Sequence, residues 1–150
     1  MTVPAKMTDP VRGSGSTQNQ IVVEWTAPSL DSETGGSAIT AYELLWDAND
    51  GATPDTVLVA LSSLSTATSY TVSSGLTEGL DYIFMIRAQN IYGEGVYSDE
   101  VTITAAAVPD TMDPITTSVV SGDVKLDFTP PSDNGEALTT LTLEVQESDG

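Results

Sequence analysis

Apolar and polar residues alternate along most of the chain, which is the pattern of β-strands that bury one face. Clusters of Gly, Pro, Ser, Asn and Asp separate the alternating runs and supply turns. No stretch of about ten residues keeps a helical period, so we expect very little helix. The pattern predicts an antiparallel all-β sandwich. The alternating runs lie at 21–25, 39–46, 57–61, 70–72, 82–88 and 101–103.

The chain also repeats itself, at a spacing of about one small domain. The offset between the copies shortens from 105 to 103 to 99 residues along the chain, as expected if loops of the second copy are shorter. The repeat predicts one complete unit at 3–106 and the N-terminal part of a second unit at 108–150. Three alanines at 105–107 form a short linker that allows limited bending. The matching segments are Val3-Pro4 with Val108-Pro109, 21–29 with 124–132, and 36–40 with 135–139.

Four motifs of the first unit resemble those of a fibronectin type III domain. Trp25 lies in the second expected strand, shortly before Pro28, and Tyr42 lies in the third. Leu76 and Tyr82 span a glycine, as in the family's tyrosine corner. The fourth motif is Arg87-Ala88-x-Asn90-x-x-Gly93-x-Gly95-x-Tyr97-Ser98, which resembles the sixth strand, the following loop and the entry to the last strand.

The resemblance covers the whole first unit and implies an immunoglobulin-like sandwich of seven strands, with A, B and E in one sheet and C, C′, F and G in the other. It implies that Phe128 and Leu141 of the second unit stand in the places of Trp25 and Tyr42, within strands B and C that follow a strand A. It implies a structural core of Trp25, Tyr42, Leu76, Tyr82 and Phe84, and an interaction loop containing Tyr92, Glu94 and Tyr97.

Composition excludes several classes of function. The chain has 4 basic and 22 acidic residues, for a net charge of −18, and it has no Cys and no His. Phosphate repels such a surface, so we expect no nucleic-acid partner and no anionic membrane partner. A disulfide framework, a Cys/His zinc site and a Ser-His-Asp triad all require residues that are missing. The sequence shows no signal peptide and no apolar run long enough to insert into a membrane.

The acidic residues themselves suggest no catalytic chemistry. Most fall in loops or at outward strand positions such as Glu24, Glu43 and Asp47, so we expect a solvated acidic surface rather than a pair of catalytic carboxylates. The segment Asp47-Ala48-Asn49-Asp50-Gly51 lacks the spacing of a calcium loop and is typical of a turn. We expect no enzyme, no cofactor, no metal site and at most weak calcium binding.

Apolar side chains at outward strand positions leave two interpretations open. Ile83 and Met85 face outward if Tyr82 and Phe84 face the core, and Leu45 lies on the neighbouring expected strand. Scattered surface apolar residues are normal in soluble domains. We favour that interpretation over a packing contact with another domain.

The sequence therefore favours a non-enzymatic structural or adhesion module from a larger tandem fibronectin type III protein. The resemblance implies a cell-surface or extracellular location and a role as a spacer or protein–protein interaction unit. Its partners would be neighbouring domains, other copies of the protein, or other surface proteins or glycans. Two alternatives stay open: a subunit of an extracellular filament, and an accessory domain of a secreted polysaccharide-degrading enzyme.

Overall fold

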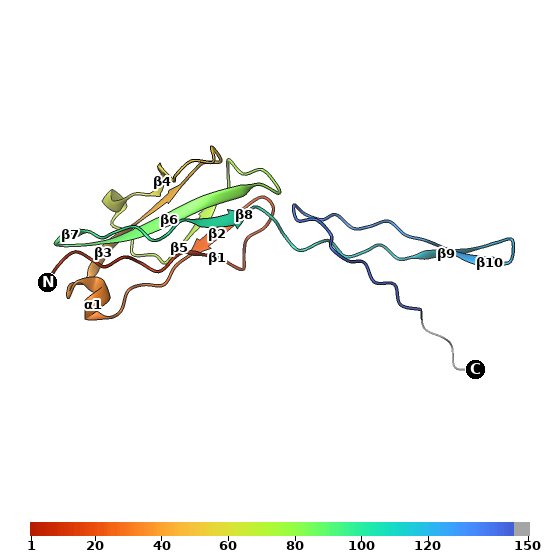
Figure 1. The fold of residues 1–150 in the computed structure, drawn as a ribbon, viewed down its shortest axis with the longest axis horizontal. Helices are drawn as coiled ribbons and strands as arrows, with labels where there is room; N and C mark the ends of the chain where they lie inside the picture. The colour runs from red at the N-terminus through yellow and green to blue at the C-terminus, as the bar shows by residue number, and fades with distance from the viewer. Residues whose placement is uncertain (146–150) are drawn as a thin grey trace.

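The computed structural model describes residues 1–145 and shows the first unit as a sandwich of two antiparallel sheets (Figure 1). The first sheet has the order β1-β2-β5, and in the second β4, β3 and β6 lie side by side while β7 and β8 both pair with β6. This arrangement confirms the predicted fold class and the division of strands between sheets. The strands are β1 (Val11–Arg12), β2 (Ile21–Glu24), β3 (Ile39–Trp46), β4 (Thr56–Val59), β5 (Ser69–Val72), β6 (Asp81–Asn90), β7 (Gly93–Glu94) and β8 (Val101–Thr104).

Helical structure in the described residues is confined to two short turns, α1 (Asp31–Thr34) and the 3₁₀ turn η1 (Leu61–Ser63). α1 ends at Gly35, whose φ of 69° lies in the left-handed region that favours glycine. The alternating run at 57–61 was expected to be one strand, but β4 ends at Val59. Leu61 begins η1 instead. The apolar alternation therefore extends past the end of the strand.

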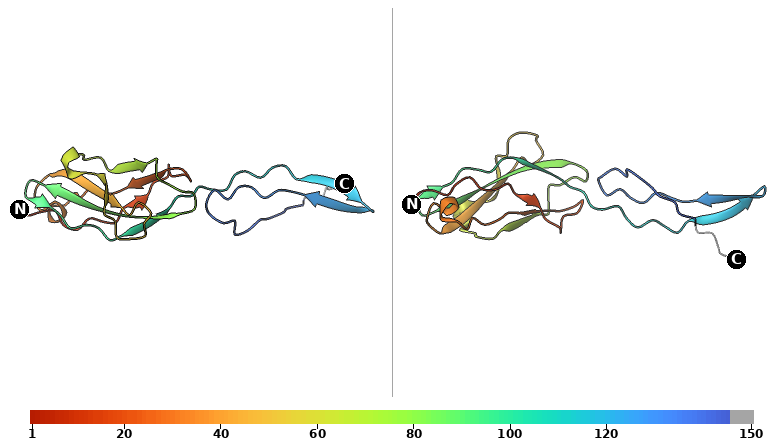
Figure 2. Two further views of the ribbon diagram at one scale, coloured as in Figure 1. Left: turned by 90° about the horizontal axis from the view of Figure 1, so that it is seen from above. Right: turned by 60° about the horizontal axis from the view of Figure 1, so that its bottom comes forward.

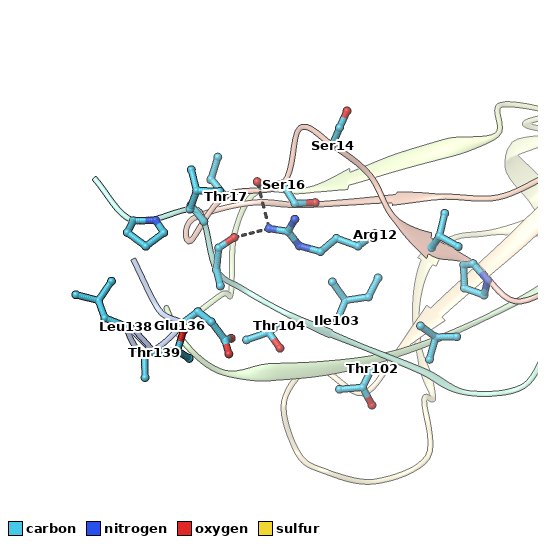
Figure 3. A pocket seen from close by; sticks show the side chains of 18 of the residues that line it. Arg12, Ser14, Ser16, Thr17, Thr102, Ile103, Thr104, Glu136, Leu138 and Thr139 are labelled. Atoms are coloured by element: carbon cyan, nitrogen blue, oxygen red, sulfur yellow. Dashed lines mark hydrogen bonds between the residues drawn. The ribbon is translucent and has the colours of Figure 1, made fainter. Parts of the chain in front are cut away.

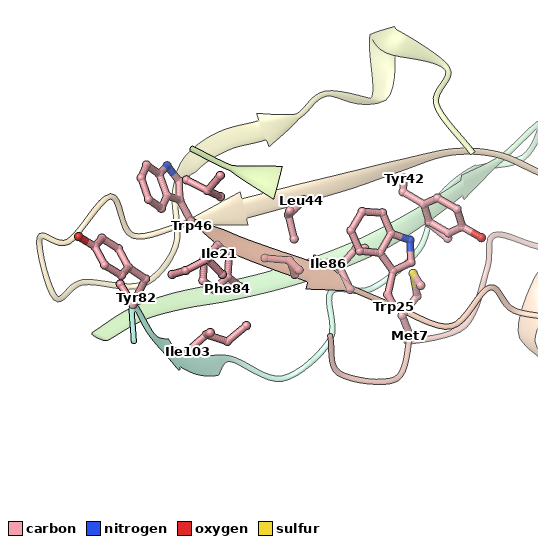
Figure 4. Packing of buried hydrophobic residues seen from close by; sticks show 14 residues of the cluster. Met7, Ile21, Trp25, Tyr42, Leu44, Trp46, Tyr82, Phe84, Ile86 and Ile103 are labelled. Carbon is pink, nitrogen blue, oxygen red and sulfur yellow. The ribbon is translucent and has the colours of Figure 1, made fainter. Parts of the chain in front are cut away.

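The core of the first unit lies between its two sheets (Figure 4). Alternate residues of β6 supply its centre, and Tyr82, Phe84 and Ile86 are completely buried. Trp25 packs edge-on against Tyr42, with ring centroids 5.8 Å apart. Large aromatic areas removed from water make this cluster the main source of the unit's stability.

The residues that the resemblance places in the core have two levels of burial. Trp25, Tyr42, Tyr82 and Phe84 are buried, whereas Leu76 is only partly buried and packs against the edge of the cluster. The Tyr82 hydroxyl accepts a hydrogen bond from the Thr77 backbone N–H at 2.7 Å. This bond connects the start of β6 to the turn before it, as the tyrosine corner implies.

Up to residue 145, the second unit is a single hairpin followed by a segment without strands (Figure 2). β9 (Thr116–Val120) pairs antiparallel with β10 (Asp123–Asp127). Ser121 and Gly122, both with positive φ, form the two-residue turn between them. No strand is assigned within 128–145, where strand C was expected, and Leu141, Leu143 and Val145 are exposed. The boundaries of this second unit stay a prediction.

Candidate interaction surface

Two loop segments are tied together by backbone hydrogen bonds at the end of the first unit where the chain begins. The segment at residues 1–5 runs beside the loop that contains α1. The Thr2 N–H donates to the Gly35 carbonyl at 2.9 Å, and the Ala5 N–H donates to the Glu33 carbonyl at 2.8 Å. Hydrogen bonds from the Leu30 N–H and then the Ser29 N–H to the Glu33 carboxylate lower the pKa of Glu33. The loop therefore has a defined shape.

Asn90 joins the β6–β7 hairpin to both of these segments. Its side chain is buried and its Nδ2 donates to the Thr2 carbonyl at 2.7 Å and to the Thr34 carbonyl at 2.9 Å. Its Oδ1 accepts a hydrogen bond from the Tyr92 N–H at 2.8 Å. Every polar atom of this buried amide thus has a partner, which fixes the three segments relative to one another.

The tip of the β6–β7 hairpin presents apolar surface. Ile91 is 74% exposed and Tyr92 is 48% exposed. The Tyr92 hydroxyl donates to the Met1 sulfur at 3.0 Å, so its ring leans toward the first residues of the chain. Of the three residues predicted for the interaction loop, Tyr92 and Glu94 are exposed, and Tyr97 is partly buried.

Glu94 and Tyr97, the other two predicted loop residues, instead contact Arg87 on the outer face of β6. The Arg87 guanidinium forms ion pairs with Glu43, at 2.6 Å, and with Glu94. It also lies over the Tyr97 ring, 4.6 Å from its centroid. The Tyr97 hydroxyl donates to the Glu43 carboxylate, and burial together with this negative charge raises the pKa of Tyr97 well above its usual range. These contacts hold the hairpin against the sheet.

The expectation of a solvated acidic surface is wrong for two of its three examples. Glu43 has only 13% of its side chain exposed because Arg87 lies directly opposite it in the β3–β6 register. Asp47 is 3% exposed, and its Oδ1 accepts hydrogen bonds from the N–H groups of Ile83 and Asn49. Glu24 is exposed as expected. The buried Asp47 and the partly buried Glu43 carboxylates serve as structural hydrogen-bond acceptors.

The outward apolar residues of the same sheet are largely covered. Leu45, expected at the surface, is buried. It lies between Val57 of β4 and Met85 of β6 in the strand register, so side chains on both neighbouring strands shield it. Ile83 and Met85 are half-buried.

Comparison with known proteins decides the family. The model of the fibronectin type III domain matches residues 8–104. The chain belongs to the fibronectin type III family. The fourth FNIII domain of a human protein superposes with a TM-score of 0.56 at 15% identity, covering 70% of this chain and 81% of that one. The sixth fibronectin type III domain of human fibronectin type III domain containing protein 3 gives 0.54 at 18% identity, over 74% and 95%.

A multidomain structure is also similar. The chicken CNTN1 FN1–FN3 domains superpose with a TM-score of 0.56 at 15% identity, over 85% of this chain and 42% of that one. At these identities the likeness is one of fold. A fibronectin type III domain is a structural or interaction module of multidomain proteins, and the functional evidence in this chain must come from its own surfaces.

The junction between the two units reproduces the hydrogen bonds found at the start of the chain. The Ala107 N–H donates to the Asn134 carbonyl at 2.9 Å, and the Asp110 N–H donates to the Ser132 carbonyl at 3.1 Å. By the repeat offsets of 105 and 99, the first pair corresponds to Thr2 with Gly35, and Asp110 corresponds to Ala5, whose N–H donates to the Glu33 carbonyl. The entry segment of each unit therefore donates two backbone hydrogen bonds to its own loop.

Asn134 is the side chain that anchors this second loop. It is buried, and its Nδ2 donates to the Val108 carbonyl at 2.9 Å and to the Asp110 carboxylate at 3.1 Å. Its φ is 50°, in the left-handed region that asparagine tolerates better than most residues, and Gly135 follows with a φ of 91°. Gly35 and Gly36 form the corresponding pair of left-handed residues in the first unit, at 69° and 73°. The sequence repeat indicated the equivalence but not these contacts.

The second loop lies directly on the turn that precedes β6. A Cβ atom added to Gly135 would stand 2.8 Å from the Gly79 nitrogen and 2.9 Å from the Ala105 carbonyl oxygen. Only glycine permits so close an approach of two backbones. Ala105 and Ala106 of the linker are themselves buried.

A groove of about 1080 Å³ opens beside this contact (Figure 3). β1 and β8 form one side, and the linker with residues 136–140 forms the other. Arg12 crosses it, and its guanidinium donates to the carbonyls of Ser16 and Ala106. Arg12 thus links the end of β1 to the linker and stabilises the junction.

Proposed function

We propose that this chain is part of a larger tandem fibronectin type III protein of the cell surface or extracellular matrix, in which it serves as a non-enzymatic spacer and protein–protein interaction unit. The observation that carries the proposal is the junction. The second unit repeats the entry hydrogen bonds of the first and docks on the Gly79 turn. A chain that acts as a spacer needs such defined contacts between consecutive units, because unattached units reorient freely.

The linker supports the same role. The Ala105 N–H donates to the Leu80 carbonyl, its own carbonyl accepts from the Gly79 N–H, and the Ala107 N–H donates to Asn134. The linker is therefore bonded to the unit before it and to the unit after it. This arrangement limits bending more than its length alone predicts.

The use of the carboxylates also fits a structural role. Glu43 is paired with Arg87 and hydrogen-bonded by Tyr97, and Asp47 caps backbone N–H groups. Both carboxylates therefore serve as ion-pair or hydrogen-bond partners within the fold.

The junction can be tested by removing one side chain. Asn134→Gly keeps the left-handed backbone but deletes the bonds to Val108 and Asp110. We expect hydrogen exchange of the Ala107 and Asp110 amides to accelerate about tenfold in the full chain, because local opening becomes easier. Asn49→Gly, at a left-handed asparagine in an exposed turn, is the matched control and should leave these amides unchanged.

Unchanged exchange of the Ala107 and Asp110 amides in the Asn134→Gly variant would reject a fixed junction and with it the spacer role. Location needs a separate measurement. Surface biotinylation of intact cells that produce the full-length protein should label it, and a protein labelled only after lysis would contradict the proposed location.

A further inference from the structure

We propose that the outer edge of the second sheet pairs with the same edge of a second copy of this chain, so that the two sheets form one continuous antiparallel sheet. We call this surface the uncharged edge. It consists of β4 and of the segment that follows it, residues 60–65. This partner belongs to the interaction role proposed above, on which the inference rests, and the surface takes no part in the junction.

β4 has an open side, because it is the last strand of its sheet (Figure 1). Within residues 1–145, its only strand partner is β3. The edge continues past the end of the strand, since the Tyr42 N–H of β3 donates to the Ser65 carbonyl at 3.0 Å. Alternate N–H and C=O groups of an edge strand point away from the sheet, so they can pair with a further strand.

The uncharged edge differs from the rest of this acidic chain in its lack of charge. No charged residue lies between Asp55 and Glu78, which is the longest such run in a chain with 22 acidic residues. Natural proteins commonly protect edge strands with charged side chains or proline, and β4 contains neither. Two copies that each carry a net charge of −18 repel each other least along such a run. The charge distribution therefore favours a second copy over a basic partner, because the run offers no carboxylate to a cation.

Two exposed apolar side chains mark the uncharged edge. Val57 of β4 is 50% exposed, and Leu64, directly after η1, is 68% exposed. Leu64 also has a φ of 49°, in the left-handed region that bulky residues seldom adopt. Backbone strain of this kind is concentrated at functional positions, and here it holds a large apolar side chain in water. Contact with another copy removes this apolar surface from water.

The sequence of β4 also permits pairing with itself. When two β4 strands pair antiparallel about a twofold axis that follows Val57, Asp55 of each copy lies opposite Ala60 of the other. The two Asp55 carboxylates then lie at opposite ends of the paired strands and do not face each other. Since β4 has only four residues, the interface is small and the dimer is weak. Several units of a tandem protein that pair in this way bind more tightly together than one unit alone.

The first test is analytical ultracentrifugation of the full chain over a range of concentrations. We expect a reversible monomer–dimer equilibrium, with an association constant that rises at least about tenfold between 0.01 M and 1 M NaCl, because salt screens the repulsion between two acidic chains. An association that weakens with salt would show an interface of opposite charges and would overturn the proposal. A chain that stays monomeric at about millimolar concentration would overturn it as well.

Two substitutions test the position of the contact, each with a matched control. Val57→Glu places a carboxylate within the paired strands and should abolish the dimer. Val11→Glu is its control, because Val11 is 56% exposed on the edge strand β1 and should tolerate the change without effect on association. Thermal unfolding of both variants shows whether the monomer is still folded.

Leu64→Asn removes the apolar side chain and suits the left-handed backbone, so the fold should be retained. It should lower the association constant about tenfold, as expected for a central apolar contact. Leu30→Asn is its control, at a leucine that is 60% exposed and lies outside the uncharged edge. Equal loss of association in both leucine variants, or in neither, would contradict the proposed surface.

Paramagnetic broadening locates the contact directly. The chain has no Cys, so Thr66→Cys attaches a single nitroxide at an exposed position next to the uncharged edge. In a mixture with the ¹⁵N-labelled natural sequence, amides of β4 and residues 60–65 should broaden most. Broadening centred on β9 and β10 would show association through the exposed hairpin and overturn the proposal. The Asn134→Gly test of the junction is made within one chain, so failure of the dimer leaves the spacer role standing.

Discussion

The two units of this chain carry the same strand and loop signals, yet one is packed and the other is not. Trp25 of the first unit is 7% exposed, whereas Phe128, in the equivalent position, is 48% exposed. Both lie directly after strands that alternate apolar and polar residues. The difference teaches that alternation specifies which residues can face a core, while burial requires a second sheet opposite them.

The loops of the two units do not differ in the way that their strands do. In both units the entry segment donates two backbone hydrogen bonds to its loop, although among residues 1–145 the core cluster belongs to the first unit alone. Those bonds depend on residues close together at one end of each unit and on left-handed backbone positions. The hydrogen bonds of these loops therefore form even where no complete sandwich surrounds them.

The largest expected contrast is in hydrogen exchange. Amides in the centre of β3 and β6 should exchange only on global unfolding, with an opening free energy of about 5–15 kcal/mol. Amides of β9 and β10 should exchange close to the free-peptide rate, since an isolated two-stranded hairpin is marginally stable in water. Exchange followed by NMR on the full chain measures both. Protection of the hairpin in a monomer would mean that it has stabilising contacts beyond the described pairing.

A matched pair of truncations gives the next largest difference. Trp25→Ala should lower the free energy of unfolding by about 3–5 kcal/mol, because it empties a packed site between the sheets. Phe128→Ala should change it by about 0.5 kcal/mol or less, as expected at an exposed position. Denaturant unfolding of both variants tests the comparison. Equal midpoints for the two variants would remove Trp25 from the core.

The fold was predictable from the sequence because its signals are local. The alternation in 82–88 gives the buried face of β6, and the spacing of Leu76 and Tyr82 gives the corner that precedes it. The side-chain contacts of the interaction surface and of the junction were less predictable. The Arg87 interactions with Glu43 and Tyr97 depend on the β3–β6 register and on the path of the chain after β7. A short sequence motif predicts neither the register nor this path. Asn134 was part of a recognised repeat, but its bonds to the linker require the folded loop.

Ion pairs in the two units provide a third comparison. Arg87→Ala should cost about 1–3 kcal/mol, because it leaves the mostly buried Glu43 carboxylate without its cation. Lys125→Ala should cost about 0.5 kcal/mol or less, since Lys125 and Asp127 pair on an exposed hairpin. Thermal unfolding of the two variants at low and high salt checks both values. A wild-type midpoint for Arg87→Ala would show that the network does not stabilise the sheet.

The smallest effect is expected at alkaline pH and depends on Tyr97. Its pKa in the folded state is raised by burial and by the neighbouring Glu43 charge, so the folded protein keeps the proton when the unfolded chain loses it. Stability should therefore fall as the pH rises above about 10, where an unfolded tyrosine ionises. Tyr97→Phe should reduce this loss. Part of it should persist because burial also raises the pKa of Tyr42.

Tyr92→Phe is the matched control for that experiment, because Tyr92 lies exposed at the tip of the same hairpin and does not contact Arg87 or Glu43. Urea unfolding at a series of pH values between neutral and strongly alkaline gives the slope of the free energy of unfolding against pH for each variant. A slope for Tyr97→Phe equal to that of wild type would show that the folded state does not retain the Tyr97 proton. In that case the hydrogen bond to Glu43 would contribute little to holding the hairpin against the sheet, and Tyr97 would belong with Tyr92 among the residues free to meet a partner.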